Sequence, residues 1–450
     1  MRLNPPIFDI PADKPYAYDK FKRQDFGNEL YNLFKDLEDS NVIALDAKWG
    51  EGKSTFIKMW IADLKLKGVS CIYYDAFEND IHEDPFISFS AEILSFAKKN
   101  CATDEHLKNM FITTATSVGK YLLTTGVKIG TKALSGGIID ASSINALNNI
   151  KDDLTEESGN LVFNYIKNKI DSFQKEKDEV EKFKNTLKEL GANIRTENKF
   201  PLVIVIDELD RCHPEFALQI IERIKHFFSV DNVSFLLVTN MEQLIRHVEV
   251  VYGIGSINAN QYLDKFITLK MGLPGKTVEN NDKYTNYKAY NNHLMYHHGI
   301  SDFKDNINYS SLPLYMHFDF SLRDIEKSIS YLTLFLLTSE QRANPETFSI
   351  FSIIKVKFPY ILSKIITQSL TYDEIEKVFN YNEFRELSSY SITKDWLRFF
   401  LKLLTMTKEE ISIDIDKENI KNTFRHGFIY NLDHKAIFSE IASKMNYCLE

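Results

Sequence analysis

The chain has 450 residues, enough for more than one domain, and 44% of them are hydrophobic, which is ordinary for a globular protein. Its formal net charge of −9 argues against a broad nucleic-acid-binding face, so nucleic acid is not expected as the primary ligand. The four cysteines are scattered without a CxxC pair, which predicts reduced thiols in a cytoplasmic protein and not a disulfide framework or a metal site. They are Cys71, Cys101, Cys212 and Cys448.

We expect neither a signal peptide nor a membrane-spanning helix from the sequence. The opening stretch "MRLNPPIFDIPADKP" carries prolines and acids and has no continuous apolar core. The most apolar stretch, residues 111–139, is interrupted by Lys120, Lys128 and Lys132 and is rich in Thr and Ser. We therefore expect an amphipathic or loosely packed helical segment there and no transmembrane segment, and we favour this over a membrane-surface role.

Five short apolar runs predict buried parallel strands. Each is rich in β-branched or aromatic residues and lacks alternation, which suits a sheet that is covered on both faces. Helical patterns lie between the runs, so the fold class is α/β. The predicted strands are Val42–Leu45, Ser70–Tyr74, Leu202–Ile206, Val233–Thr239 and Phe266–Leu269.

A helical insertion, residues 82–200, separates the second and third strands, because this gap is too long for a simple crossover. Its last part places five apolar residues on one helix face, and Gly191 follows as a predicted C-terminal cap. The charged remainder predicts a solvated face, and a partner-binding coiled coil is the alternative. The face consists of Phe173, Val180, Phe183, Leu187 and Leu190.

The character of the chain changes near Gly275. A polar, loop-like stretch is followed by a region rich in Phe, Tyr, Leu and Ile that shows no series of strands. We expect an α/β domain over residues 1–275 and a helical lid and C-terminal helical region over residues 276–450.

The segment "VIALDAKWGEGKST" carries the pattern of a phosphate-binding loop after the first strand. Gly50 and Gly52 let the backbone turn its N–H groups inward, Lys53 can reach the β- and γ-phosphates, and Ser54 offers a hydroxyl to Mg²⁺. Ala47 stands where the strict pattern has its first glycine, and its small side chain weakens the match without removing it. We expect the nucleotide-binding residues to be Trp49, Gly50, Glu51, Gly52, Lys53, Ser54 and Thr55.

The segment "FPLVIVIDELDRC" delivers acids to the end of the third strand, where ligands bind in open α/β sheets. Asp207 would hold Mg²⁺ through its water shell, and Glu208 is placed to orient and deprotonate an attacking water. A helix N-cap would explain one acid after a strand but explains the whole D-E-x-D-R run poorly. The two motifs together predict a P-loop NTPase.

The fourth strand, "VSFLLVTN", ends in Thr239 and Asn240. Asn240 could sense the γ-phosphate or hold the water, or it could cap the helix that follows, and the sequence favours neither reading.

Two other short matches are better explained by chance. "NKID", residues 168–171, matches a guanine-reading motif, but it lies inside a helical pattern and precedes the acidic strand, so we keep ATP over GTP. His293 and His297 lie four residues apart without a HExxH glutamate or an evident acidic or cysteine partner, which favours a surface-loop or core role over zinc.

These motifs together resemble the KAP family of P-loop NTPases over roughly residues 15–340. "WGEGKS" is similar to the family loop, and "DELDRC" from Asp207 resembles the family's "DDLDRC", with Glu208 in place of the second Asp. "YYDAFEND", "YLDKFITLKMGLP" and "FSLRDIEKSISYL" resemble a strand end, a downstream run and a helical-lid segment of the family.

The resemblance implies the fold of the additional-strand (ASCE, AAA- and STAND-like) ATPases, with a parallel sheet in the order 5-1-4-3-2, and it implies ATP as the nucleotide. It also implies that Arg323, in the lid-like segment, reaches the nucleotide. Many members carry transmembrane helices between the two motifs, whereas this insertion looks soluble. Bacterial relatives are associated with phage exclusion and defence, and others with signalling complexes at membranes.

The arginines are candidates for completing the site, because a stabilising positive charge often arrives from a lid or a neighbour. Arg323 is the first candidate. Arg211 is the second, either as a finger offered to a neighbouring subunit in a homo-oligomer or as a structural ion pair with Asp210, and the sequence favours the ion pair.

The sequence leaves three possible functions open. The first is an Mg²⁺-dependent ATPase acting as a switch, whose output lies in a separate effector protein, such as an operon partner, in anti-phage defence. The second is an ATP-binding scaffold with negligible turnover, which Ala47 and the long insertion motivate. The third, nucleic-acid translocation, is disfavoured by the acidic charge.

Overall fold

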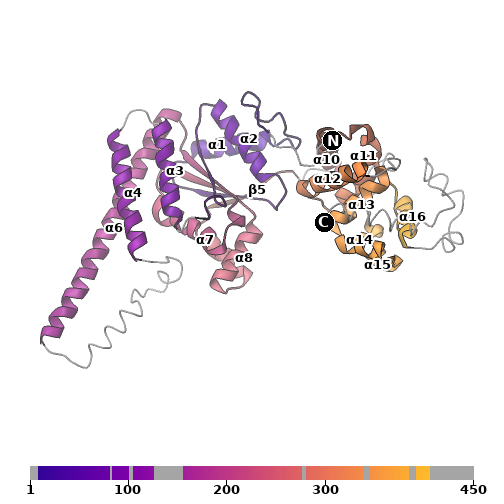
Figure 1. Cartoon of the computed structure of the whole chain (residues 1–450). Coiled ribbons are helices and arrows are strands. Elements are labelled where there is room, and N and C mark those ends of the chain that lie inside the picture. Colours follow the sequence, from indigo (N-terminus) through magenta and orange to yellow (C-terminus); the bar gives the residue numbers. More distant parts are fainter. Residues whose placement is uncertain are drawn as a thin grey trace. The chain divides into compact units, whose positions relative to one another are not determined.

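The structure is a computed structural model, and it describes residues 9–81, 84–100, 105–125, 156–275, 280–338, 345–384 and 392–405 (Figure 1). Two compact units can be separated: a sheet unit, residues 10–48 and 53–274, and a helical unit that combines Trp49–Gly52 with the chain from Gly275 onward. Each unit is described by itself. Cys101, Cys448 and residues 126–139 of the apolar stretch lie outside the described residues.

The sheet unit is built on five parallel strands in the order β2-β3-β4-β1-β5. This is the order 5-1-4-3-2 read from the other edge, so the predicted fold class and strand order are confirmed. Asp46 at the end of β1 is in register with Thr239 of β4, and Asp207 of β3 with Asp75 of β2. The strands are β1 (Val42–Asp46), β2 (Ile72–Asp75), β3 (Leu202–Asp207), β4 (Val233–Thr239) and β5 (Leu269–Gly272).

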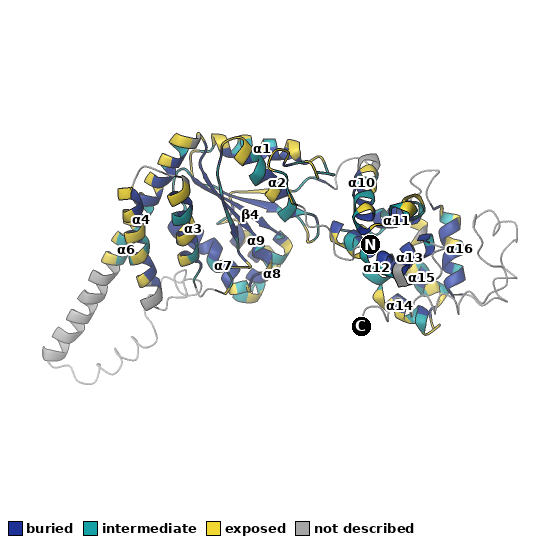
Figure 2. Ribbon diagram, turned by 45° about the horizontal axis from the view of Figure 1, so that its top comes forward, coloured by how far each residue is buried: buried dark blue, intermediate teal, exposed yellow. Residues whose placement is uncertain are grey.

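The two central strands explain why the sequence shows continuous apolar runs. Every residue of β3 and β4 is buried, because helices cover both faces of the sheet (Figure 2). Alternate residues of each strand enter different cores: Val203 and Val205 pack with the helices of one face, Ile204 and Ile206 with those of the other. The helices that contribute to the first core are α1 (Gln24–Asp36) and α2 (Lys53–Leu66).

The other face carries most of the remaining helices of this unit. Its core is formed by α3 (Pro85–Asn100), α7 (Pro214–Arg223), α8 (Met241–Tyr252) and α9 (Ser256–Leu263), together with the two long helices of the insertion that are described below. Two short turns flank α7: the 3₁₀ turn η2 (Leu209–Arg211) lies between β3 and α7, and the π-helical turn η3 (Ile224–Phe228) lies between α7 and β4.

The fifth strand lies further along the chain than predicted. The prediction was Phe266–Leu269, whereas β5 spans Leu269–Gly272 and is largely exposed at the edge of the sheet. The Phe266 and Ile267 side chains pack in the hydrophobic core of the sheet unit, although they precede the strand. Pairing with β1 begins with the hydrogen bond from Thr268 N to Val42 O at 2.8 Å.

The insertion forms long helices, α4 (Glu105–Thr125) and α6 (Glu156–Asn198), beside α3 (Figure 1). The predicted apolar face of α6 is confirmed from Val180 to Leu190, while the Phe173 side chain lies outside the described set. Phe183 contacts the rings of Phe86, Phe111 and Phe228, so this part of the face packs inside the chain and not on a coiled-coil partner.

Gly191 does not end α6, which continues to Asn198 and also contains the "NKID" residues 168–171. A Cβ on Gly191 would lie 3.1 Å from Val233 Cγ2 and 3.3 Å from the Asn232 carbonyl oxygen. The glycine is therefore explained by close packing of the helix against the start of β4, and the predicted cap is wrong.

In the helical unit, every regular element of the described residues is a helix, as the sequence predicts. None of the described helices in either unit is long and apolar enough to span a lipid bilayer. The longer helices are α10 (Asn280–His298), α11 (Lys304–His317), α12 (Leu322–Thr338), α13 (Pro345–Lys357), α14 (Pro359–Ile366), α15 (Tyr372–Phe379) and α16 (Lys394–Thr405). Short 3₁₀ turns, η4 (Ser301–Phe303) and η5 (Tyr381–Glu383), accompany them.

Candidate nucleotide-binding site

The carboxyl ends of the parallel strands bring polar side chains to one edge of the sheet. Asp46, Asp75, Asp207 and Thr239 are the last residues of β1, β2, β3 and β4. Because parallel strands end at the same edge, residues from distant parts of the sequence meet there. This edge is where open α/β sheets bind their ligands.

Lys53 is the first residue of α2, directly after the predicted phosphate-binding loop. Its side chain is buried, and Nζ donates a hydrogen bond to the Ala47 carbonyl oxygen at 2.6 Å. Burial lowers the pKa of Lys53, and the nearby carboxylates of Asp210, Asp207, Glu208 and Asp46 oppose that change. The structure therefore brings the loop lysine and the acids of the β3 end together, as predicted from the sequence.

The loop has the backbone conformation that its glycines suggest. Gly50 has φ = +80° and Gly52 has φ = +79°, a region that favours glycine. Ala47 is not among the described residues with positive φ, and its N–H donates to the Thr239 carbonyl oxygen at 3.2 Å. Alanine therefore fits the position where the strict pattern has a glycine, because the backbone there continues the strand.

Asp207 is fully buried, and donors on the protein hold its carboxylate. The Tyr73 hydroxyl donates to Oδ2 at 3.0 Å, and the Glu208 N–H donates to Oδ1 at 2.8 Å. Burial raises the pKa of Asp207, while hydrogen bonds from Ser54, the Glu208 N–H and Tyr73 oppose the rise. Tyr73 was not predicted from the sequence, although an aromatic residue two positions before a strand end can reach its neighbouring strand.

Glu208 stands just beyond the end of β3 with φ = 61°, a left-handed conformation that is unusual for this residue type. Its Oε1 accepts a hydrogen bond from Ser54 Oγ at 3.0 Å, and its Oε2 pairs with Arg211 Nε. Burial and the adjacent Asp207 raise the pKa of Glu208, and the Arg211 guanidinium opposes this. Glu208 therefore links the loop serine to the acidic motif.

Arg211 lies in η2 and is more than a third exposed. The ion-pair partner that the structure shows for it is Glu208 and not Asp210, which corrects the predicted pair. The three-residue step from Glu208 to Arg211 within a single turn puts the two side chains together, and Asp210 is buried instead. The role of Arg211 as a finger toward a neighbouring subunit stays a prediction.

Asn240 caps α8, and its side-chain oxygen accepts a hydrogen bond from the Glu242 N–H at 3.2 Å. The capping interpretation is confirmed, and a sensor role stays a prediction. The preceding Thr239 is fully buried, and its Oγ1 has no hydrogen-bond partner among the described residues. Asp46 Oδ1 accepts from the Met241 N–H at 2.9 Å, which joins this helix to the end of β1.

Of the remaining predicted residues, Trp49, Glu51 and Arg323 belong to the helical unit. Trp49 is 47% exposed, and Glu51 is buried. Within this unit, the Gly50 carbonyl oxygen accepts a hydrogen bond from the Arg323 backbone N–H at 3.3 Å. Thr55 lies in the first turn of α2, in the sheet unit. The contacts of Trp49, Glu51, Thr55 and the Arg323 guanidinium with a nucleotide stay predictions.

The residues at this edge fit a magnesium-bound polyphosphate. The unpartnered Thr239 hydroxyl, the Ser54 hydroxyl and the Asp207 carboxylate supply oxygen atoms, which Mg²⁺ prefers together with phosphate oxygens and water. Lys53 supplies a cation whose present partner is a loop carbonyl, a group that a phosphate oxygen can replace.

The sequence model of the KAP family P-loop domain matches residues 23–338. No curated protein matches the chain.

Among solved structures, the chain resembles the ORC2 protein of Aeropyrum pernix in its ADPNP–ADP complexes, with 11% identity, a TM-score of 0.36, and coverage of 95% of this chain and 94% of that one. It also resembles the ADP form of that protein, with 12% identity, a TM-score of 0.32, and coverage of 98% and 96%. These likenesses are too distant to add to the argument. The family match extends over more than half of the sequence and includes every motif at the edge of the sheet, so the chain belongs to the KAP family of P-loop NTPases.

Proposed function

We propose that this protein binds Mg-ATP and hydrolyses it, and that the nucleotide state switches its interaction with a separate protein. The observation that supports the proposal is the meeting of Lys53, Ser54, Asp207 and Glu208 at one edge of the sheet. Membership of a P-loop NTPase family supports nucleotide binding, and ATP as the nucleotide rests on the family resemblance.

Binding begins with the loop and the first turn of α2. The phosphates of ATP take the place of the Ala47 carbonyl as the partner of Lys53 Nζ, and the N-terminus of α2 adds its N–H groups and dipole. Ser54 and Asp207 would hold the magnesium ion, and Tyr73 orients the Asp207 carboxylate for this role. When bound, Mg²⁺ neutralises charge on the phosphate oxygens.

Hydrolysis needs Glu208 to accept a proton from the attacking water. Its raised pKa makes the carboxylate a stronger base than an exposed glutamate, which suits that task. Before it can act, Glu208 exchanges at least one of its present partners, Ser54 or Arg211, for the water. The Ser54 hydroxyl, which would help to hold the metal ion, would then no longer donate to Glu208.

The switch is completed by groups outside the sheet. Arg323 reaches the nucleotide from the lid, and loss of the γ-phosphate loosens the lid and changes what the helical parts bind. If the protein forms a homo-oligomer, Arg211 is exposed enough to contact a neighbour's nucleotide. The output lies in a protein effector, with a role in bacterial anti-phage defence that rests on the family resemblance alone.

The first experiment measures Mg²⁺-dependent phosphate release by the purified chain. Lys53→Ala should abolish ATP binding and turnover, whereas Glu208→Gln should bind ATP and lose turnover. A Lys53→Ala protein with unchanged binding and turnover would end the proposal. GTP added as a competitor tests the choice of nucleotide, because an ATP site should discriminate against it.

The effector and defence parts need separate experiments. A pull-down in ATP and in a non-hydrolysable analogue reports the partner and the nucleotide state that recruits it. Phage plating on bacteria that express the chain with its neighbouring genes tests defence, with Lys53→Ala as the matched control. Equal plating efficiency with and without Lys53 would remove the defence role and leave the ATPase intact.

A second candidate function is an ATP-binding scaffold with negligible turnover. The observation that favours it is that Glu208 is engaged by both Ser54 and Arg211, which leaves neither carboxylate oxygen without a contact. Strong thermal stabilisation by ATP, with no phosphate release even when a partner is present, would favour the scaffold.

A further inference from the structure

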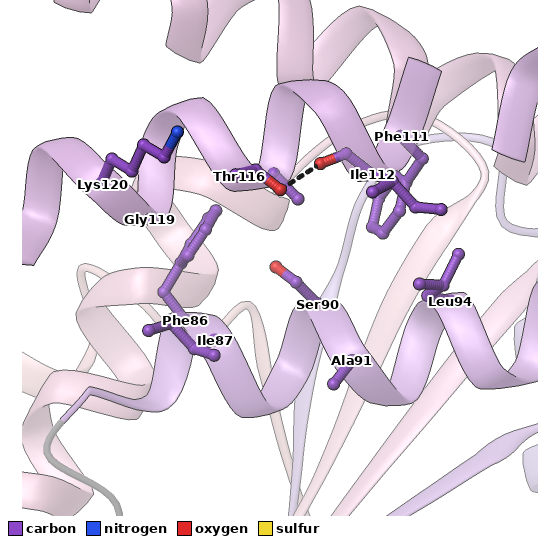
Figure 3. Close-up of a pocket in the computed structure, with 11 residues that line it drawn as sticks. Phe86, Ile87, Ser90, Ala91, Leu94, Phe111, Ile112, Thr116, Gly119 and Lys120 are labelled. Atoms are coloured by element: carbon purple, nitrogen blue, oxygen red, sulfur yellow. Dashed lines mark hydrogen bonds between the residues drawn. The ribbon is translucent and has the colours of Figure 1, made fainter. Parts of the chain in front are cut away.

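In the described part of the chain, a groove lies between α3 and α4, outside the nucleotide site. Its volume is about 310 Å³, which is at the lower end of the range for small-molecule sites. Figure 3 shows side chains of both helices facing the space between them. The apolar walls include Phe86, Ile87 and Leu94 from α3 and Phe111, Ile112 and Ala115 from α4.

The walls of the groove are anchored, so the groove is not closed by a simple shift of either helix. Phe86 of α3 packs on Phe183 and Phe228, with ring centroids 5.2 Å and 5.4 Å away. Phe111 of α4 packs on the same Phe183 at 5.4 Å. Arg223 of α7 pairs with Asp84, immediately before α3, at 2.6 Å. The groove is the gap that remains when both helices are seated on this shared aromatic core.

Ser90 gives the groove a buried polar point, and the exposed Thr116 and Lys120 also line it. The side chain is only 7% exposed, and Oγ has no hydrogen-bond partner among the described residues. In Figure 3 this oxygen points into the space between the helices. A serine in a helix commonly bonds to the carbonyl four residues earlier, as Thr116 on the opposite wall does with Ile112 O at 2.7 Å. A buried hydroxyl without a partner costs free energy that a ligand can recover.

Two further features leave the groove open to a ligand. Gly119 of α4 lines it, and a Cβ built there would meet only Ile87 Cγ1, at 3.9 Å, so the glycine leaves free space on that wall. Ile87 and Ile112 are 46% and 38% exposed, which makes the rim of the groove apolar. An apolar rim beside an apolar cavity suits an apolar ligand.

We propose that the α3–α4 groove binds a small, largely apolar organic molecule that carries one hydrogen-bonding group, which pairs with the Ser90 hydroxyl. The volume suits one aliphatic chain or one aromatic ring system and not a macromolecular segment of many residues. The apolar body is bound by Phe86, Phe111 and the two rim isoleucines, and Ser90 fixes its orientation. This site does not depend on the nucleotide, so it can be tested without ATP.

The test uses methyl NMR of the full chain labelled at isoleucine, with 1-octanol and indole as aliphatic and aromatic probes. At least one probe should shift the Ile87 and Ile112 methyl signals saturably and leave that of Ile257, which is exposed on α9, unchanged. The proposal is overturned if neither probe binds saturably, or if all three signals shift together. It is also overturned if the Ile87 and Ile112 signals depend on protein concentration without a probe, which would indicate that a second copy covers the groove.

Matched variants test the geometry of the site. Ser90→Ala should weaken binding of the effective probe about fivefold, because it removes one hydrogen bond. Thr116→Val should leave the affinity unchanged, since the Thr116 hydroxyl is already bonded within its helix. Gly119→Leu should abolish binding by filling the groove, whereas Gly119→Ala should retain it, and circular dichroism confirms that each variant is folded. Equal affinities for the Ser90→Ala and parent proteins would overturn the assignment of the polar contact.

Discussion

Tyr73→Phe tests how the carboxylate of Asp207 is positioned. The substitution removes only the hydroxyl that donates to Asp207 Oδ2 at 3.0 Å. Because Asp207 is fully buried, water does not readily replace the lost donor. A hydrogen bond to a charged group contributes about 1.5 to 3 kcal/mol, so the free energy of unfolding of the sheet unit should fall by about 2 kcal/mol.

The adjacent tyrosine provides a matched control. Tyr74 faces the opposite core, and its hydroxyl hydrogen-bonds to Ser88 Oγ at 2.6 Å. This bond joins two neutral groups, so Tyr74→Phe should cost about 1 kcal/mol. Hydrogen exchange of the amides of β3, Leu202–Asp207, measures both losses in the folded chain.

The functional effect should separate the two tyrosines more clearly than stability does. Groups that orient a metal ligand typically affect metal affinity or activity by about 10- to 100-fold. Tyr73→Phe should therefore raise the Mg²⁺ concentration needed for half-maximal phosphate release about tenfold, and Tyr74→Phe should leave it unchanged. If both variants show the same magnesium dependence, the Tyr73 hydroxyl does not position Asp207 and the reasoning is refuted.

Three further predictions concern the acids and two glycines. Arg211→Gln removes a charge that lowers the pKa of Glu208, so the acidic limb of the pH–rate profile should move to higher pH; an unmoved limb would separate Glu208 from catalysis. Asp207→Asn removes a carboxyl whose pKa in the folded protein is raised by burial, so the variant without ligand should be more stable than the parent at pH 7. This advantage should shrink as the pH falls through the raised pKa, because the parent carboxyl then becomes protonated. Urea titrations at several pH values would contradict this if the difference in stability stayed constant. Gly191→Ala should destabilise the folded protein by about 1 kcal/mol, because the added Cβ would lie 3.1 Å from Val233 Cγ2. Gly119→Ala has free space for its Cβ and should stabilise the folded protein by up to about 1 kcal/mol. Thermal unfolding of the two variants would refute this if both changed stability in the same direction.

Much of the sheet could be predicted because its strands carry their own signal. Val233–Thr239 was placed with its observed bounds, since a strand buried on both faces is apolar along its whole length. The fifth strand was predicted to start too early, at Phe266, because an apolar residue buried in a turn gives the same local pattern as one buried in a sheet. The predicted end of the helix at Gly191 was wrong, because a glycine required by close packing on a neighbouring strand cannot be told in sequence from a glycine that caps a helix.

The candidate site divides in a similar way. The loop lysine and the acids could be predicted because strand, loop and helix are contiguous in the sequence at both motifs. The ion pair between Arg211 and Glu208 could not, because three acids lie within reach along the chain and only the turn η2 selects one of them. Tyr73 contacts Asp207 across 134 positions of sequence, and that contact depends on the pairing of β2 with β3.

Local sequence is enough to predict the features that depend on neighbouring residues: which runs form buried strands, which loop can turn its N–H groups inward, and which acid ends a strand. The packing of the chain is needed to know which of these groups meet, which hydroxyls donate to Asp207 and Glu208, and where two anchored helices leave a groove beside Ser90. The physical reason is that backbone conformation and burial patterns are set over a few residues, whereas side-chain contacts depend on strand order and helix packing across the whole unit.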